Sequence, residues 1–279
     1  MFDCHIPDYA FQRGAVCRLH GVKRFVIGKS LCGRSIFAVR IGCTGPLSLI
    51  AGGFHGMEYL TVLSVLRFAA ECAEKPELLG GKSVMLVPCV NPDGTEIALH
   101  GAKAACRFQR LVQKTGESSR WQANARGVDI NHNFNAGWQE VKRREIAAGI
   151  TKPSPTRFGG CFPESEPETR ALTALCRQYH FARVLALHSQ GREIYWDFGK
   201  YTPQNCLDLA QRLSDVSGYR VASPEPMAVG GGFKDWFIRC FHRCGITVEM
   251  GLGKNPLPLS DFEEEYPLVK NILREYIRY

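Results

Sequence analysis

Short apolar runs rich in valine, isoleucine and leucine recur along this chain. The runs lie at 36–41, 47–51, 84–90, 184–188 and 245–249. Stretches with helix-like patterning lie at about 58–73, 165–180, 203–216, 231–243 and 260–278. Apolar runs of this length are typical of strands that are buried on both faces of a parallel sheet. The pattern therefore predicts an α/β fold, an α/β/α sandwich on a mixed, mostly parallel central sheet.

The length and composition of the chain favour one domain. A chain of 279 residues with 45% hydrophobic content can bury a single large core, so we predict one domain over residues 1–279. Two long polar connections interrupt the pattern, at about 101–128 and 137–162. Connections of this length within a compact domain often form the rim of a functional site.

Polar side chains with metal-binding chemistry follow three of the apolar runs. His55 and Glu58 come just after the run at 47–51, His188 ends the run at 184–188, and Glu249 ends the last run. Open α/β sheets bind ligands outside the carboxyl ends of their strands. We therefore expect these side chains to converge at one edge of the sheet.

The residue types favour a catalytic zinc site. Catalytic zinc takes three protein ligands and leaves a fourth position for water, and the short spacing lets His55 and Glu58 share one ion. We predict that His188 is the third ligand and that Glu249 is the general base, because a carboxylate closing an apolar strand is costly unless it is paired, hydrated or poised for proton transfer. The pair His55 and Glu58 alone is a weak signal, and a histidine that ends a buried strand is often a satisfied core residue.

The order of several short motifs resembles the zinc metallocarboxypeptidase family. The matching elements are His55–Glu58, Asn91–Gly94, Gly127–Asn133, His188 and Glu249. The tail at 249–258 looks like the branch of bacterial γ-D-glutamyl-diamino-acid peptidases, which act on cell-wall peptides. Of these elements, we read Asn91–Gly94 first as a tight turn, in which proline presets φ and glycine tolerates a left-handed conformation.

The resemblance implies a mechanism and a supporting residue. One Zn²⁺ ion would activate water, and Glu249 would take the proton and return it to the leaving amine. Asp129 matches the family carboxylate that orients the first zinc histidine, although it could also be a loop cap.

The basic donors of the family are not matched in this chain. Asn131 matches a position that helps to hold the substrate carboxylate, but His132 follows it where ordinary carboxypeptidases have an arginine. Histidine offers a weaker, pH-dependent contact there. Gln122 stands where a basic residue usually supports the oxyanion, and Arg126 or Arg120 could substitute for it.

Two further positions concern the substrate. The region at 226–228 has no match for the family's mobile tyrosine. Asp235 lies where related enzymes build the pocket for the side chain that follows the cut, and its carboxylate would suit the distal ammonium of diaminopimelate. A charge partner for a helix N-terminus is an equally good interpretation of Asp235.

The charge and the cysteines bear on the binding partner and on the cellular compartment of the protein. The formal net charge is +8, but lysine and arginine are scattered, which argues against a nucleic-acid partner and agrees loosely with an anionic peptide substrate. Twelve cysteines lie singly along the chain, which favours reduced thiols in a cytoplasm. No uninterrupted apolar run is long enough for a membrane span, and the first residues lack a signal-peptide pattern.

The candidate zinc site and the resemblance together imply a zinc metallopeptidase, and the resemblance implies that it hydrolyses an amide bond in murein peptides, the γ-D-glutamyl-meso-diaminopimelate bond. An aspartoacylase-type zinc deacylase and a catalytically inactive muropeptide-binding homologue stay open as alternatives. The oligomeric state and the preference for endo- or exopeptidase cleavage are not predicted.

Overall fold

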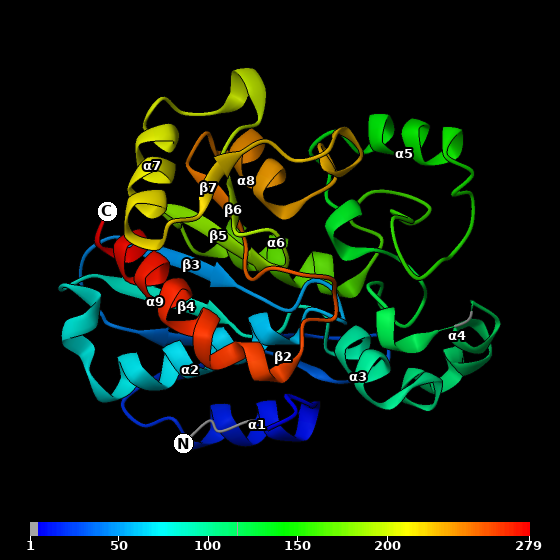
Figure 1. The fold of residues 1–279 in the computed structure, drawn as a ribbon, viewed down its shortest axis with the longest axis horizontal. Helices are drawn as coiled ribbons and strands as arrows, with labels where there is room; N and C mark the ends of the chain where they lie inside the picture. Colours follow the sequence, from blue (N-terminus) through cyan, green and yellow to red (C-terminus); the bar gives the residue numbers. More distant parts are fainter. Residues whose placement is uncertain (1–4, 116) are drawn as a thin grey trace.

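The computed structural model of the chain describes residues 5–115 and 117–279. Within these residues, eight strands form one sheet in the order β1-β2-β4-β3-β5-β8-β6-β7 (Figure 1). The strands are β1 (Lys23–Lys29), β2 (Ser35–Ile41), β3 (Leu47–Ala51), β4 (Ser83–Val87), β5 (Arg183–His188), β6 (Glu193–Tyr195), β7 (Arg220–Ala222) and β8 (Gly245–Glu249). The central strands β4, β3, β5 and β8 are parallel, and β2 and β6 flank them antiparallel.

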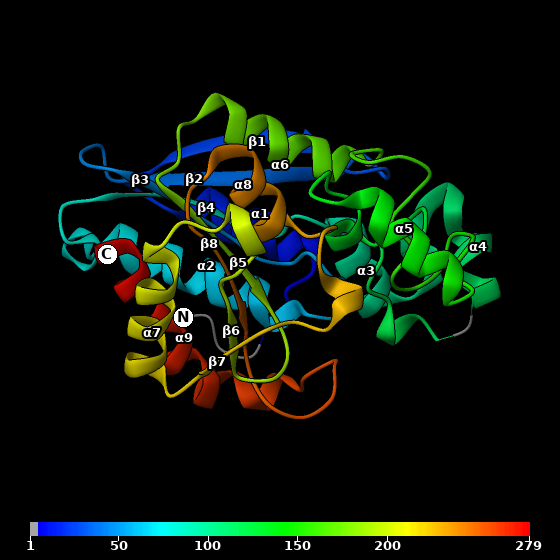
Figure 2. The same ribbon diagram turned by 90° about the horizontal axis from the view of Figure 1, so that it is seen from above.

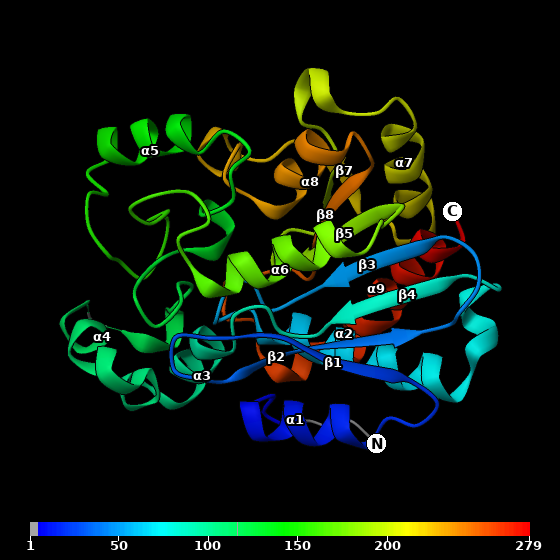
Figure 3. The ribbon, with the colours of Figure 1, turned by 180° about the vertical axis from the view of Figure 1, so that it is seen from behind.

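Helices cover both faces of this sheet. The α-helices are α1 (Tyr9–Arg18), α2 (Tyr59–Glu74), α3 (Pro92–His100), α4 (Gln109–Thr115), α5 (Trp138–Ala147), α6 (Pro167–Gln178), α7 (Asn205–Ser217), α8 (Phe233–Phe241) and α9 (Phe262–Arg278). Helices α6 and α8 pack on one face, and α1, α2, α7 and α9 lie on the other (Figures 2 and 3). Helices α3, α4 and α5 lie beyond the end of the sheet (Figure 1). None of the helices in the described ranges is long and apolar enough to cross a membrane.

The predicted α/β/α fold class is confirmed, and the five apolar runs all form strands, although the run at 84–90 ends as a strand at Val87. The pattern missed the edge strands β1 and β7 and the strand β6 beside β7, which are short or partly exposed and carry charged residues. It also missed α1 and α3, and the two long polar connections contain α4 and α5. The assignment of residues 1–279 to one domain stays a prediction.

The segment Asn91–Gly94 begins a helix, so its interpretation as a tight turn is wrong. The side chain of Asn91 caps α3 by accepting a hydrogen bond from the backbone N–H of Gly94, at 2.9 Å. Gly94 is not in the left-handed region. The lack of a side chain at Gly94 allows close packing instead, because a Cβ atom there would lie 2.6 Å from the carbonyl oxygen of Ala123.

Two apolar clusters on opposite faces of the sheet fix the ends of the central strands. On β3, Ile50 packs toward α2, whereas Leu49 packs toward α8. Such alternation sets the register, because a slip by one residue would turn every buried side chain to the wrong face. In this register, His188 pairs with Glu249 on the neighbouring strand. The core therefore places two predicted site residues side by side.

Three buried carboxylates, Asp93, Glu166 and Glu168, join α3 to the start of α6. The side-chain amide of Asn124 donates to Glu166 at 2.7 Å and to Glu168 at 3.3 Å. Arg34 pairs with Asp93 at 2.6 Å. Burial, with the charges of Asp93 and Glu166, raises the pKa of Glu168 to about 8. Glu168 is therefore protonated in the folded protein at neutral pH.

This raised pKa makes the stability of the protein pH-dependent. An acid whose folded-state pKa lies above its unfolded value stabilises the fold least when it is ionised, so the free energy of unfolding should fall as the pH rises from about 4.5 to about 8. Glu168→Gln stays neutral throughout and should be more stable than the wild type by about 5 kcal/mol at pH 8.5, the equivalent of the shift from 4.5 to about 8. Urea unfolding at pH 5.5 and pH 8.5 measures the difference, with the exposed Glu77→Gln as control. Equal pH slopes in both variants would contradict the assignment.

Candidate metal centre and active site

The structure brings His55, Glu58 and His188 together at the carboxyl ends of β3 and β5. Glu58 is the N-cap residue of α2, and His188 is the last residue of β5. Nδ1 of His55 lies 2.8 Å from one carboxylate oxygen of Glu58, and Nδ1 of His188 lies 3.1 Å from the other. Among the described residues, this is the group of histidine, cysteine or acidic side chains arranged to hold a metal ion, with ligand atoms all within 4.8 Å of one another.

This donor set fits zinc. Two ligand atoms on a tetrahedral zinc ion, each about 2.0–2.2 Å from it, are roughly 3.4 Å apart. The observed separations of 2.8 and 3.1 Å would have to widen by only a few tenths of an ångström. Two imidazoles and one carboxylate also match the ligand types of catalytic zinc. The ring of His188 is further fixed by stacking on Phe54, with a centroid distance of 4.9 Å.

Two of the ligands already have the protonation state that metal binding requires. Burial acts to raise the pKa of Glu58, but His55 and His188 outweigh it and lower the pKa to about 2. Burial lowers the pKa of His188. A carboxylate and a neutral imidazole are the forms that bind zinc without first losing a proton.

Asp129 supports the first histidine from the loop that precedes α5. One oxygen of its carboxylate lies 3.2 Å from Nε2 of His55, and the other accepts a hydrogen bond from the backbone N–H of Arg157 at 2.9 Å. It also caps a short 3₁₀ turn by accepting from the N–H of Asn131. The contact on Nε2 leaves Nδ1 of His55 directed at Glu58 and the metal position.

Replacing this carboxylate should weaken zinc binding without removing a ligand. We expect Asp129→Asn to lower zinc affinity by about 10–100-fold, because the amide holds the imidazole less firmly and makes it less basic. Titration against a competing chelator measures the change, and near-ultraviolet circular dichroism checks the fold. Unchanged zinc affinity in a folded Asp129→Asn protein would show that Asp129 acts only as a loop cap.

Glu249 ends β8 beside the metal cluster, directly opposite His188 in the register of the sheet. Burial, followed by the negative charge of Glu58, raises its pKa well above the usual range. A cation at the three ligands would lower it again, because an opposite charge nearby favours the ionised form. Glu249 also lines a small cavity together with Asn131 and Asp235. A carboxylate between the metal position and a cavity is suited to moving protons on a bound substrate.

The two substrate-binding candidates in this cavity have partners within the protein. The side-chain oxygen of Asn131 accepts a hydrogen bond from the N–H of Phe233 at 3.1 Å. Both oxygens of Asp235 are engaged, one by Lys234 Nζ at 2.5 Å and the other by the N–H of Gly230 at 2.7 Å. The predicted contacts of Asn131 and Asp235 with substrate stay predictions.

The other three candidate residues for binding the substrate or the oxyanion are His132, Arg126 and Arg120. Nδ1 of His132 lies 3.1 Å from the buried carboxylate of Glu145. Arg126 is 43% exposed, and its Nε atom lies 3.8 Å from Glu166. Arg120 is exposed at the end of a short 3₁₀ helix. Within the described ranges no hydrogen bond or ion pair joins these side chains to the three metal ligands, so their roles stay predictions.

Tyr195 is a cavity residue that the sequence pattern did not identify. It lies on β6, where its neighbour Glu193 pairs with Glu249, and it lines the same cavity as Glu249. Its hydroxyl donates to Glu193 at 2.5 Å. A strand of three residues gives almost no periodic signal, so only the alternation of Glu193, Ile194 and Tyr195 could have indicated it. The structure therefore places a phenol in the cavity of Glu249, whereas the region at 226–228 has no tyrosine.

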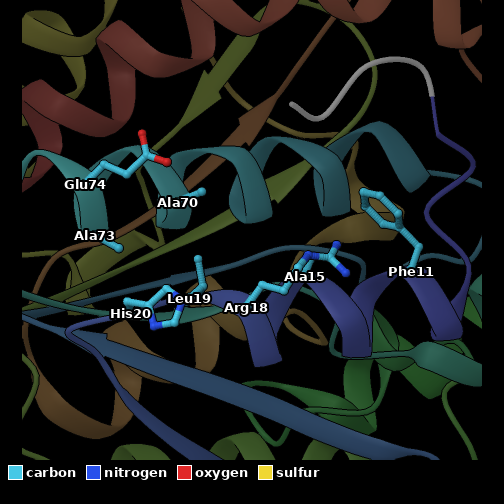
Figure 4. Close-up of a pocket in the computed structure, with 8 residues that line it drawn as sticks. All are labelled: Phe11, Ala15, Arg18, Leu19, His20, Ala70, Ala73 and Glu74. Carbon is cyan, nitrogen blue, oxygen red and sulfur yellow. The ribbon is translucent and has the colours of Figure 1, made fainter.

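A second hollow lies far from this chemistry, between α1 and α2. Figure 4 shows the side chains that line it. Phe11 and Ala15 come from α1, Leu19 directly follows α1, and Ala70 and Ala73 come from α2. It shares no residue with the candidate site, and α1 and α2 lie on the face of the sheet opposite to α8.

Comparisons with known proteins agree with this arrangement. The zinc carboxypeptidase family matches residues 20–268. An uncharacterized protein of Bacillus subtilis (strain 168), YqgT, is 32% identical over 265 residues, which cover 88% of this chain and 69% of that protein. Gamma-D-glutamyl-L-diamino acid endopeptidase 1 of Lysinibacillus sphaericus is 32% identical over 280 residues, which cover 93% of this chain and 69% of that protein.

Solved structures show the same fold. Bovine thrombin-activatable fibrinolysis inhibitor, in complex with a tick carboxypeptidase inhibitor, superposes with a TM-score of 0.78 at 19% identity and covers 97% of this chain and 94% of its own. Murein-tripeptide amidase MpaA of Escherichia coli O157 gives a TM-score of 0.58 at 22% identity, with 90% and 91% of the two chains covered. With its fold, its match over residues 20–268 and its grouped His55, Glu58 and His188, the chain belongs to the zinc carboxypeptidase family and is a zinc metallopeptidase.

Proposed function

We propose that this peptidase cleaves the γ-D-glutamyl-meso-diaminopimelate bond of murein peptides. The observation that carries the proposal is the position of Glu249, which lies opposite His188 and lines a cavity beside the metal ligands. The substrate class is supported by the 32% identity, over 93% of this chain, with a protein named as a gamma-D-glutamyl-L-diamino acid endopeptidase.

Each residue of the site has a separate role in the proposed hydrolysis. Zinc held by His55, Glu58 and His188 would polarise the scissile carbonyl and lower the pKa of a water molecule. Glu249 takes the proton of that water as its oxygen attacks the carbonyl carbon. The C–N bond then breaks, and Glu249 returns the proton to the leaving nitrogen. Asp129 keeps the ring of His55 in place throughout.

We propose that Arg126 supplies the cation that stabilises the oxyanion. Its guanidinium is 43% exposed, and its ion pair with Glu166 is long, at 3.8 Å. The competing donor is the side-chain amide of Gln122, whose backbone carbonyl accepts from the N–H of Gly56 next to the metal ligands. Arg126→Gln should lower kcat about tenfold or more. A loss in Gln122→Met instead of Arg126→Gln would assign the role to the neutral amide.

Asn131, His132 and Arg120 are proposed to contact the carboxylates of the substrate. The support for Asn131 is its place in the cavity of Glu249. His132 follows it directly, and its ring is already bonded to Glu145, so we expect it to make a weaker contact than an arginine would. Arg120 is exposed and would act only at the rim.

The direct test is hydrolysis of L-Ala-γ-D-Glu-meso-diaminopimelate by the zinc-loaded protein, followed by mass spectrometry. We expect release of diaminopimelate, and no release by Glu249→Gln. Faster turnover of an N-acyl amino acid would indicate a deacylase of the aspartoacylase type. Tight binding of the muropeptide without cleavage at any zinc loading would indicate an inactive binding homologue.

We further propose that the protein works in the cytoplasm. The support is that each of the eleven cysteines within residues 5–115 and 117–279 is a free thiol, as expected in a reducing compartment. Cell fractionation with an antibody against the chain tests this, and recovery outside the cytoplasm would contradict it.

A further inference from the structure

A buried lysine, Lys234, lines the cavity of the general base. Its side chain is only 7% exposed, and it shares the cavity with Tyr195, Thr247 and Glu249. A lysine is rarely buried to this extent unless its charge is paired. It also lies in the first turn of α8, where the helix dipole disfavours a positive charge. The buried ammonium group therefore requires a partner or a ligand whose interaction offsets these unfavourable terms.

The hydrogen-bond acceptors of the protein satisfy only part of the ammonium group of Lys234. Nζ of Lys234 donates to the carboxylate of Asp235 at 2.5 Å and to the backbone carbonyl of Asp197 at 2.6 Å. An ammonium group has three N–H donors, so one donor is left after these two contacts. Asp235, in contrast, has both oxygens occupied, by Lys234 and by the N–H of Gly230. The spare hydrogen-bonding capacity of the pair therefore lies on the ammonium.

The surrounding backbone holds the lysine in this position. A Cβ atom at Gly245 of β8 would lie 3.1 Å from Cγ of Lys234, so the stem crosses the strand where the side chain is missing. Nζ is then fixed between the segment that follows β6, at Asp197, and the start of α8, at Asp235. A donor fixed in this way loses little conformational entropy when it binds a ligand.

We infer that Lys234 is a specificity residue that binds a carboxylate on the side chain of the substrate residue following the cut. This inference rests on the peptidase function proposed above and names the group that the cavity selects. An anion is the ligand that best uses a spare ammonium donor, and it must be held close to Glu249, whose own charge would otherwise repel it. Diaminopimelate carries such a carboxylate beside its distal amine. The earlier alternative, in which Asp235 binds that amine, would require Asp235 to give up a bond with Lys234 or Gly230.

Four matched peptides separate the two possibilities. Each has the form L-Ala-γ-D-Glu-X, where X is meso-diaminopimelate, 2-aminopimelate, lysine or norleucine. These residues carry a distal carboxylate and amine, a carboxylate only, an amine only, or neither. For the zinc-loaded wild type we expect kcat/KM for 2-aminopimelate to exceed that for norleucine at least tenfold, with the difference in KM. Lysine should have no advantage over norleucine.

The variants then test the residue. In Lys234→Met the ratio of 2-aminopimelate to norleucine should fall to about one, and Lys234→Arg should recover part of it. Because Lys234→Met leaves Asp235 buried without its ion pair, the double variant Lys234→Met with Asp235→Asn, which removes both charges, is measured beside it. Zinc affinity and circular dichroism check that each protein is folded.

Three results would overturn the inference. The first is a wild type that does not prefer the carboxylate peptides. The second is an unchanged ratio in folded Lys234→Met and in the double variant. The third is a preference for lysine over norleucine that is lost in Asp235→Asn, which would make Asp235 the selective residue. If none of the peptides is cleaved, the proposed function fails instead, and calorimetric binding of the same four peptides still ranks them and tests Lys234.

Discussion

Glu249→Gln should reduce kcat by about 1,000-fold or more while zinc affinity stays within a few-fold of the wild type. Glutamine keeps the size and polarity of the side chain but cannot accept the proton of the attacking water or return it to the leaving amine. Glu249 is not one of the three grouped metal ligands, so the ion should remain bound. Steady-state kinetics on the muropeptide, with zinc content measured on the same samples, gives both quantities.

A matched control is Glu264→Gln, because that carboxylate is 82% exposed at the start of α9. It makes the same chemical change away from the site, and its kcat should stay near that of the wild type. If Glu249→Gln kept more than about a tenth of the wild-type kcat with zinc bound, another group would be the base. Tyr195 would then be the first residue to examine, because it lines the same cavity.

The metal cluster was predictable because its residues end strands that are visible in the sequence. His188 and Glu249 close apolar runs, and His55 follows another. In a parallel sheet such ends lie at one edge, so a one-dimensional pattern is enough to bring residues together that are far apart in the chain. The grouping of His55, Glu58 and His188 follows from that rule and from the family motifs.

Other residues that line the cavity of Glu249 could not be predicted in this way. Tyr195 lies on a strand of three residues at the antiparallel side of the sheet, where periodicity carries no signal. The pairing of Lys234 with Asp235 depends on where the backbone of Asp197 passes, which is a tertiary contact. The bond between His132 and Glu145 likewise depends on α5, which lies inside a segment that reads as a polar loop. Substrate recognition is therefore the part of the site that required the structure.

Loss of a metal ligand should have the other large effect, on activity and stability together. Zinc binds the folded cluster and not the unfolded chain, so zinc at 100 times its dissociation constant should stabilise the wild type by about 2.7 kcal/mol and raise Tm. His188→Ala leaves two ligands, His55 and Glu58, and should lose this zinc-dependent increase in Tm and all measurable hydrolysis.

Thermal unfolding with zinc and with a chelator measures the effect on stability. The control is His100→Ala, whose side chain is 45% exposed at the end of α3, and it should keep the full increase in Tm. Without zinc, His188→Ala should unfold somewhat below the chelated wild type, because the alanine removes a buried imidazole and its hydrogen bond to Glu58, while the strand pairing of β5 with β8 stays intact. A zinc-dependent increase in Tm that survives in His188→Ala would mean that the ion is held by ligands other than these three.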